Sequence, residues 1–174
     1  MPVRPSRITA IAAACLFSLS THAVELPAAD LYKQAQAEQP SYLETVKELV
    51  SVDTGTGQEK GLATISALLV KRLKELGATV QTTPATPSVG DNIVGTFKGT
   101  GSKNFLLMVH YDTVFGPGTA AKRPFRTDQE RAYGPGVADA KGGVAMILHA
   151  LKLLKAQGFD GYGTLTVLFN PDEE

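Results

Sequence analysis

The sequence predicts an α/β fold in which helices flank a mostly parallel sheet. Apolar segments with helical spacing alternate along the chain with short apolar segments that have the length and composition of strands. One of these strands, residues 104–110 (NFLLMVH), is almost continuously apolar, which is typical of a strand buried on both faces. Hydrophobic residues make up 43% of the chain and charged residues 20%, an ordinary globular balance. We therefore expect one layered α/β domain.

The first 23 residues have the pattern of a secretory signal peptide. Arg4 and Arg7 give a positive start, residues 8–19 are mostly apolar, and small residues precede a cleavage site after Ala23. The apolar run is shorter than the ~20 residues that a membrane-spanning helix needs. We expect residues 1–23 to be removed and residues 24–174 to act in the periplasm or outside the cell, with no membrane attachment.

The only cysteine, Cys15, lies in this leader. A lipoprotein reading of Cys15 is disfavoured, because no Leu stands three residues before it. The mature chain therefore lacks a thiol, which excludes cysteine catalysis and disulfides. Lys and Arg equal Asp and Glu at 17 each, so no basic excess points to nucleic acid.

Helices are expected first along the mature chain. Residues 30–40 favour a short leading helix, and residues 41–52 an amphipathic helix that begins with a capping box of Ser41 and Glu44. Apolar residues at helical spacing predict a longer helix over 58–76, ended by Gly77. A later helix is expected over 141–157. Strands are expected over 78–82, 92–97, 104–110 and 164–169, with irregular chain over 115–129.

Three polar motifs follow strands or begin a helix, where ligands bind in open α/β sheets. The first is His110-Tyr111-Asp112-Thr113. While the chain stays extended, His110 and Asp112 point to the same side, so the carboxylate is placed to orient the imidazole of a metal ligand. From these residues alone, a hydrogen-bonded histidine at a strand end beside a loop aspartate is the favoured interpretation.

The second motif, residues 133–143 (YGPGVADAKGG), places Asp139 just before a helix. A helix cap would explain Asp139, but Gly142 and Gly143 weaken a first helical turn and instead indicate close backbone approach. The spacing of the glycines fits neither phosphate-binding loop pattern. The third motif, residues 170–174 (NPDEE), sets three carboxylates after an apolar strand, which suits either a solvated loop or a cation site.

Taken together, HYDTV, GPGVADAKGG and FNPDEE resemble the M20 family of co-catalytic zinc peptidases, and within it the glutamate carboxypeptidases. The segments DTGTGQEKGLATISALL and VGDNIVGTFKG carry the same likeness, which runs from about residue 30 to the end. The resemblance implies a zinc-peptidase catalytic domain. It also implies that the peptide bond between Asp139 and Ala140 is cis. Ala140 itself departs from this subgroup, which often has a second Asp there.

The resemblance also implies a role for each motif residue. His110 and Glu174 would each ligate one of two zinc ions, and Asp139 would bridge them. Glu173 would be the general base, and Asp112 would orient His110. Each zinc then lacks one ligand within this sequence, because the family's further carboxylate and histidine lie later in the chain. His149 is not expected to replace them, since it lies on the predicted helix over 141–157.

We therefore expect residues 24–174 to be the N-terminal part of a catalytic domain, without the family's lid and dimerisation domain. The expected enzyme is a zinc-dependent metallo-carboxypeptidase that cleaves C-terminal glutamate-type amide bonds of small peptide or folate-like substrates. An aminoacylase or dipeptidase of the same family is an alternative, as is an inactive metal-binding fragment. The literal chain is expected to be inactive, and a longer parent protein to form a homodimer.

Overall fold

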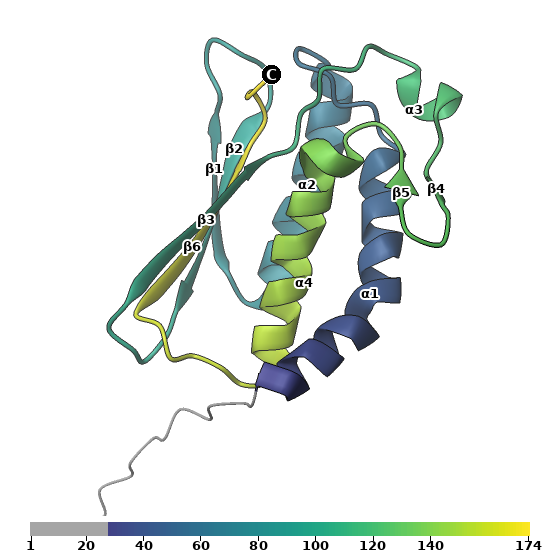
Figure 1. The fold of residues 1–174 in the computed structure, drawn as a ribbon. Helices are drawn as coiled ribbons and strands as arrows, with labels where there is room; N and C mark the ends of the chain where they lie inside the picture. The colour runs from purple at the N-terminus through teal and green to yellow at the C-terminus, as the bar shows by residue number, and fades with distance from the viewer. Residues whose placement is uncertain (1–27) are drawn as a thin grey trace, which may run out of the picture.

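The computed structural model describes residues 28–174, so the predicted signal peptide lies outside the described residues. A four-stranded sheet and three long helices make up most of this part of the chain (Figure 1). In chain order the elements are α1 (Ala28–Val50), α2 (Glu59–Leu76), β1 (Thr79–Pro84), β2 (Asp91–Lys98), β3 (Asn104–His110), α3 (Thr119–Lys122), β4 (Arg126–Thr127), β5 (Ala132–Tyr133), the π-helical turn η1 (Val137–Lys141), α4 (Gly142–Ala156) and β6 (Thr164–Asn170).

The sheet is mixed, with strand order β1-β2-β6-β3. Strand β6 pairs antiparallel with β2 and parallel with β3, and β1 pairs antiparallel with β2. The predicted α/β class is correct, but the predicted mostly parallel sheet is wrong for the described residues. The error has a physical cause: the short connection between β1 and β2 can only reverse the chain, whereas the α4 crossover allows β3 and β6 to run parallel.

All three long helices lie on one side of the sheet (Figure 1). The core between the layers comes from apolar side chains such as Leu49, Leu69, Ile93, Leu148 and Phe169, which are buried. Burial of this kind contributes about 25 cal/mol per Å² of apolar surface and is the main force that joins the layers.

Strand β3 lies at the edge of the sheet, and its burial contradicts the sequence-based expectation. Phe105, Leu106 and Met108 are 50%, 60% and 66% exposed, while Leu107 is half-buried against the helices. A continuous apolar pattern predicted a strand covered on both faces. In the described residues β3 has one neighbouring strand and helices on one face only.

Helix α1 is continuous from Ala28 to Val50, although the sequence predicted two helices with a capping box at Ser41. Pro40 lies inside the helix, and Figure 1 shows that α1 bends along its length. Proline removes one backbone donor and disturbs the preceding turn, so a bend is its expected effect. Packing of α1 against α4 on both sides of Pro40 explains why the helix does not end there.

The other helices and strands lie close to their predicted bounds. Gly77 ends α2 with φ of 105°, as a left-handed C-cap should. The segment predicted as irregular contains the short helix α3 and the hairpin strand β4. Within the described part of the chain, no helix is long and apolar enough to cross a membrane.

Candidate metal centre

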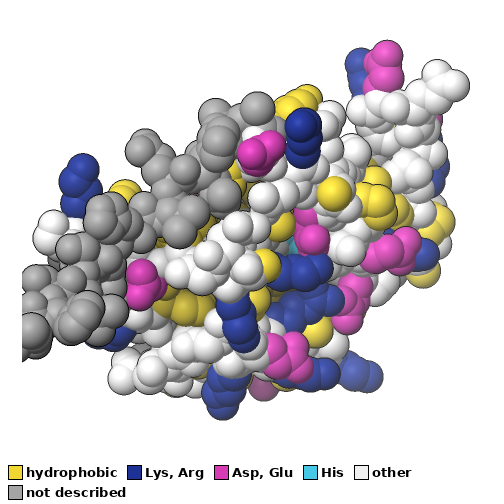
Figure 2. Space-filling view, turned by 90° about the horizontal axis from the view of Figure 1, so that it is seen from below, with side chains coloured by type: hydrophobic (Ala, Val, Ile, Leu, Met, Phe, Trp, Pro, Cys, Tyr) yellow, Lys and Arg dark blue, Asp and Glu magenta, His cyan; other side chains and the backbone are white. Residues whose placement is uncertain are grey.

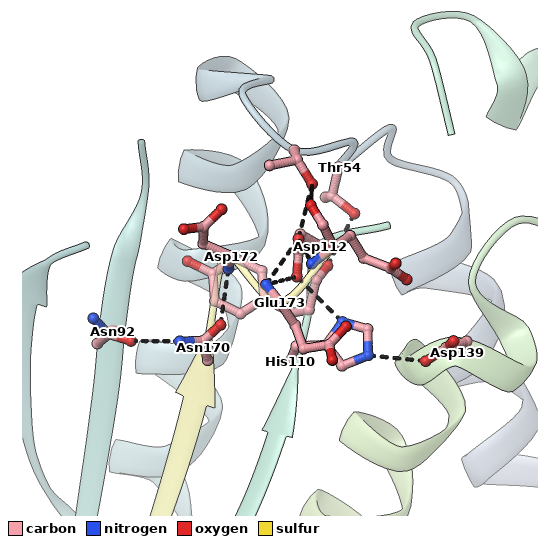
Figure 3. A network of polar contacts seen from close by, with 11 residues as sticks. Thr54, Asn92, His110, Asp112, Asp139, Asn170, Asp172 and Glu173 are labelled. Atoms are coloured by element: carbon pink, nitrogen blue, oxygen red, sulfur yellow. Dashed lines mark hydrogen bonds and ion pairs between the residues drawn. The ribbon is translucent and has the colours of Figure 1, made fainter. Parts of the chain in front are cut away.

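Parallel pairing of β3 and β6 brings two of the three motifs together. His110 at the end of β3 lies opposite Asn170 at the end of β6, so the segments that follow both strands begin at the same edge (Figure 3). The backbone N–H of Tyr111 donates to the Asn170 carbonyl at 2.8 Å and fixes this register. Helix α4 then returns the chain from β3 to β6, which places the turn before α4 at the same end.

The His110 imidazole lies between two carboxylates. Its Nδ1 is 3.2 Å from Asp112 Oδ1 and its Nε2 is 2.9 Å from Asp139 Oδ1 (Figure 3). The His110 side chain is 11% exposed, Asp112 is fully buried and Asp139 is 76% exposed. Burial alone lowers the pKa of His110, but the hydrogen bonds to Asp139 and Asp112 outweigh it and raise the pKa above its usual value. Both ring nitrogens thus face oxygen acceptors.

Asp112 collects hydrogen bonds from several parts of the site. Its carboxylate accepts from the backbone N–H groups of Glu173 and Glu174, from the Thr56 hydroxyl, and lies beside His110. A buried carboxylate is stable only when hydrogen-bonded or paired, and these partners satisfy that need. The geometry predicted from sequence, with Asp112 orienting His110, is present. The side chain also fixes the backbone that carries both glutamates.

Asp139 is presented by the η1 turn that precedes α4. The peptide bond between Asp139 and Ala140 is cis, as the resemblance implied. Gly142 was predicted to permit a close approach, and a Cβ there would lie 2.4 Å from the Val137 carbonyl oxygen. Gly136 has φ of 80°, a left-handed conformation that favours glycine. The Gly-Pro-Gly run therefore shapes the turn that directs Asp139 toward His110.

Glu173 and Glu174 complete the cluster. His110, Glu173 and Glu174 each offer a ligand atom, and these atoms lie within 4.8 Å of one another. Partial desolvation, followed by repulsion from Asp139 and Glu173, raises the pKa of Glu174. Asp139 contacts His110 but is not part of that closest group. The structure thus brings all five predicted site residues together, while their individual roles stay predictions.

Sequence reasoning missed the loop between α1 and α2. The Thr54 hydroxyl donates to the Tyr111 carbonyl, and the Thr56 hydroxyl lies within hydrogen-bond distance of both Asp112 Oδ2 and the Glu174 carbonyl. Gly55 sits so close to the Phe115 carbonyl that a Cβ would lie 2.2 Å from it. The DTGTG run was a visible turn signal, but no local pattern showed which strand end it would contact.

Lys141 was also missed. Its side chain is almost fully buried, and its Nζ donates to the carbonyls of Leu49 at 3.0 Å and Val52 at 2.7 Å. These carbonyls lie at the end of α1, where helices leave acceptors without partners. Desolvation lowers the pKa of Lys141 to about 8. The ammonium thus ties the turn that carries Asp139 to the C-terminus of α1.

His149 lies in a separate polar network between helices, as expected for a residue of α4. Its Nδ1 is 2.6 Å from Glu38 Oε1, and its Nε2 is 2.8 Å from Thr45 Oγ1. Arg72 donates to the same Thr45 hydroxyl, and Lys152 donates to Glu38. Figure 2 shows acidic and basic side chains side by side on the face of the molecule seen from below. His149 contacts none of the motif residues in the described structure.

Known proteins have sequences similar to the part of the chain that forms this centre. The model of peptidase family M20/M25/M40 matches residues 106–174, which contain every predicted site residue. The chain is 51% identical, over 99% of its length, to carboxypeptidase G2 from Pseudomonas sp. (strain RS-16). The chain belongs to peptidase family M20. It spans 42% of the length of carboxypeptidase G2, so it is similar to less than half of that protein.

Two further M20-like comparisons agree with this placement. Acetylornithine deacetylase from Photorhabdus laumondii is 31% identical over 65% of this chain, which covers 31% of that protein. The M20 family metallo-carboxypeptidase Sso-CP2 from Sulfolobus solfataricus has a similar fold, with a TM-score of 0.62 at 19% identity over 75% of this chain and 30% of that one. Membership of M20 implies metal ions. The predicted α/β class therefore matches a catalytic domain of this family in part.

The donor set of the M20 centre fits divalent zinc. One imidazole and several carboxylates are nitrogen and oxygen ligands of the kind that zinc takes. Four acidic side chains, Asp112, Asp139, Glu173 and Glu174, meet around one imidazole, which leaves an excess of negative charge for a cation to balance. The buried Asp112 behind His110 is the usual second partner of a zinc-ligating histidine.

Proposed function

We propose that the protein is a zinc-dependent carboxypeptidase that hydrolyses C-terminal glutamate-type amide bonds. One observation carries the proposal: identity of 51% with carboxypeptidase G2 over 99% of the chain coincides with a clustered His110, Glu173 and Glu174. Because the chain covers 42% of that relative, the proposal concerns the whole protein that contains this stretch.

The resemblance to M20 peptidases suggests a role for each residue, and the geometry is compatible with these roles. His110, Asp139 and Glu174 would hold the two metal ions, with Asp139 shared between them. When bound, paired zinc ions lower the pKa of a water molecule and polarise the amide carbonyl. Asp112 keeps the His110 ring in place through Nδ1 and leaves Nε2 directed at Asp139.

Glu173 is proposed as the general base. It belongs to the same cluster as His110 and Glu174, and its side chain is exposed to solvent. Its backbone N–H donates to Asp112, so the buried carboxylate positions it relative to the ligands. A glutamate held in this way accepts a proton from the attacking water and returns it to the leaving nitrogen.

Expression of the complete gene tests the proposal. The zinc-loaded product should release glutamate from N-acyl-glutamates, and Glu173→Gln should lower kcat by about 10²–10⁴-fold with unchanged zinc content. The matched control substrate is the corresponding N-acyl-aspartate, whose side chain is one methylene shorter. Full activity after complete zinc removal would contradict the proposal.

A second candidate function is amide hydrolysis of a different N-acyl substrate. The 31% identity with acetylornithine deacetylase over 65% of this chain supports it. Release of acetate from N-acetylornithine without release of glutamate from N-acyl-glutamates would favour this alternative. The same zinc and Glu173 dependence is expected for both.

The remaining features of the proposal follow the resemblance. Substrates are small peptide or folate-like molecules, and the longer protein is proposed to form a homodimer. The leader-like residues 1–23 support action in the periplasm or outside the cell. Digestion with an added protease tests this location, by comparing how much of the mature protein is protected in intact cells and in osmotically shocked cells.

A further inference from the structure

A cationic hollow lies beside the turn that carries Asp139, apart from the metal ligands. It has a volume of about 430 Å³ and is formed by α3, the β4–β5 hairpin and η1. Figure 1 shows α3 and the hairpin beyond the helices, on the side away from the four-stranded sheet. Its main lining residues are Lys122, Arg123, Arg126, Tyr133, Val137 and Ala138. None of the described residues that line the hollow is acidic.

The three cations of the hollow have no carboxylate in ion-pair contact among the described residues. Ion pairs within 4.0 Å join Lys33, Lys47, Lys71, Arg72 and Lys152 to neighbouring acids, but none involves Lys122, Arg123 or Arg126. Asp128 interacts electrostatically with Arg126, and its carboxylate also accepts hydrogen bonds from the Tyr133 hydroxyl and from the backbone N–H groups of Glu130 and Arg131. Asp128 therefore partly balances the charge of Arg126, whereas Lys122 and Arg123 have no acidic side chain in ion-pair contact among the described residues.

Aromatic rings hold both guanidinium groups in place. The Arg126 guanidinium lies 3.8 Å from the centroid of the Tyr133 ring, and that of Arg123 lies 5.1 Å from the Phe115 ring. Stacking uses the face of a guanidinium and leaves its N–H groups, which lie in the plane, available to an oxyanion. The groups are thus ordered before any anion arrives, which reduces the entropy cost of binding.

The backbone around the hollow is fixed as well. The Tyr133 hydroxyl donates to Asp128 Oδ2 at 2.7 Å, which orients the ring beneath Arg126. At the other side, Asp53 accepts hydrogen bonds from the backbone N–H groups of Gly118 and Ala120 and holds α3. Helix α3 and the β4–β5 hairpin are therefore both fixed by hydrogen bonds around the hollow that Lys122, Arg123 and Arg126 line.

We propose that Lys122, Arg123 and Arg126 form a binding site for a small oxyanion, either a carboxylate or a phosphate group, separate from the metal centre. Planar guanidinium groups recognise both anions through paired N–H donors. The site goes beyond the proposed function, since it uses none of the metal-ligating residues and does not depend on hydrolysis.

The test is an NMR titration of the metal-free, full 174-residue chain with inorganic phosphate and, separately, with glutarate at constant ionic strength. Metal is removed with a chelating resin, because a soluble chelator is itself a polycarboxylate and zinc would bind both probes. We expect saturable shift changes in the amides of Gly134 and Ala138. The probe with the lower Kd identifies the preferred oxyanion.

Variants distinguish binding at a specific site from general attraction of the anion to positive charge. Arg126→Gln should weaken binding about tenfold, and Arg126→Lys should also weaken it, because it keeps the charge but loses the paired donors. Lys103→Gln removes one exposed charge just before β3 and should leave the Kd within about twofold of the parent value. Equal losses in Arg126→Gln and Lys103→Gln, or no saturation with either probe, would overturn the proposal. Lys122→Gln replaces Arg126→Gln if the latter fails to fold by circular dichroism.

Discussion

His110 and His149 each contact a carboxylate through Nδ1, but their second nitrogens meet different groups. The Nε2 of His110 faces the carboxylate of Asp139, whereas the Nε2 of His149 faces the hydroxyl of Thr45. A neutral imidazole has one donor and one acceptor nitrogen. His149 is fully satisfied in that form, because the hydroxyl can donate to it.

His110 is not satisfied as a neutral ring, because both of its neighbours are acceptors. Either a second proton or a metal ion must lie between Nε2 and Asp139. The exposed carboxylates of Glu173 and Glu174 beside it add to the demand for a cation. The two side chains are 11% and 12% exposed, so burial does not distinguish them. The partner of the second nitrogen does, and it makes His110 rather than His149 the candidate metal ligand.

Zinc affinity should give the largest separation between the two histidines. His110→Ala is expected to weaken zinc binding by about a hundredfold or more, because it removes the only nitrogen donor of the cluster. His149→Ala should change the affinity by less than about threefold, since its network does not touch the ligands. Competition with a chromophoric zinc chelator measures both. Equal weakening in two folded variants would break the distinction.

Asp112→Asn tests whether the carboxylate beside His110 Nδ1 affects zinc binding by orienting the imidazole ring. The amide keeps one acceptor oxygen but replaces the other with an NH2 donor, so the N–H groups of Glu173 and Glu174 lose part of their acceptor. Loss of such a partner of a ligand histidine typically weakens metal binding about 10–100-fold. The same chelator competition applies, with Asp160→Asn as an exposed control of identical chemistry. An Asp112→Asn affinity equal to that of the control would show that orientation of His110 is unimportant.

Lys141→Met tests how much the buried ammonium, which ties the turn that presents Asp139 to helix α1, contributes to the free energy of unfolding. Two carbonyls at the end of α1 lose their donor, so we expect about 1–3 kcal/mol of destabilisation at pH 7. The parent chain should gain stability as pH rises from about 8 toward 10.5, because the unfolded lysine keeps its proton longer than the buried one. The variant should lack this gain, so the difference grows with pH. Urea unfolding at pH 7 and pH 9.5 checks both statements, and a difference that shrinks at pH 9.5 would contradict them.

Glu38→Gln should have the smallest effect and should concern stability alone. Burial by itself raises the pKa of Glu38, but hydrogen bonds from Lys152 and His149 outweigh it and lower the pKa. A carboxylate with a lowered pKa stabilises the fold above its unfolded value of 4.5, and this contribution disappears as pH falls through the folded value. We expect a loss of about 1 kcal/mol at pH 7 that is smaller at pH 3. Urea unfolding at both pH values measures it, and zinc affinity should not change.

Local patterns in the sequence determined most of the helices and strands. Spacing of apolar residues located α2, α4, β2, β3 and β6, and Gly77 marked the end of α2. These features depend on interactions between residues a few positions apart. The same locality explains the failure at Pro40, where contacts of α1 with α4 maintain a helix that local propensity would end.

The candidate residues His110, Asp112, Asp139, Glu173 and Glu174 were identified from three motifs, but their common location depended on the sheet. Only the parallel pairing of β3 with β6 places His110 beside the residues after Asn170. Thr56 and Lys141 could not be assigned from sequence, because each acts through contacts with segments more than fifty residues away. Burial of β3 was equally undetermined, since it depends on which strands and helices cover it.

The sequence by itself therefore determined the candidate site residues and most of the helices and strands, because those depend on residue type and short-range periodicity. Tertiary structure alone decided that the sheet is mixed, that Asp112 gathers donors from three segments, and that His110 rather than His149 faces two carboxylates. The physical reason is that hydrogen-bond partners and burial are set by distances between remote segments, which only the packed layers fix.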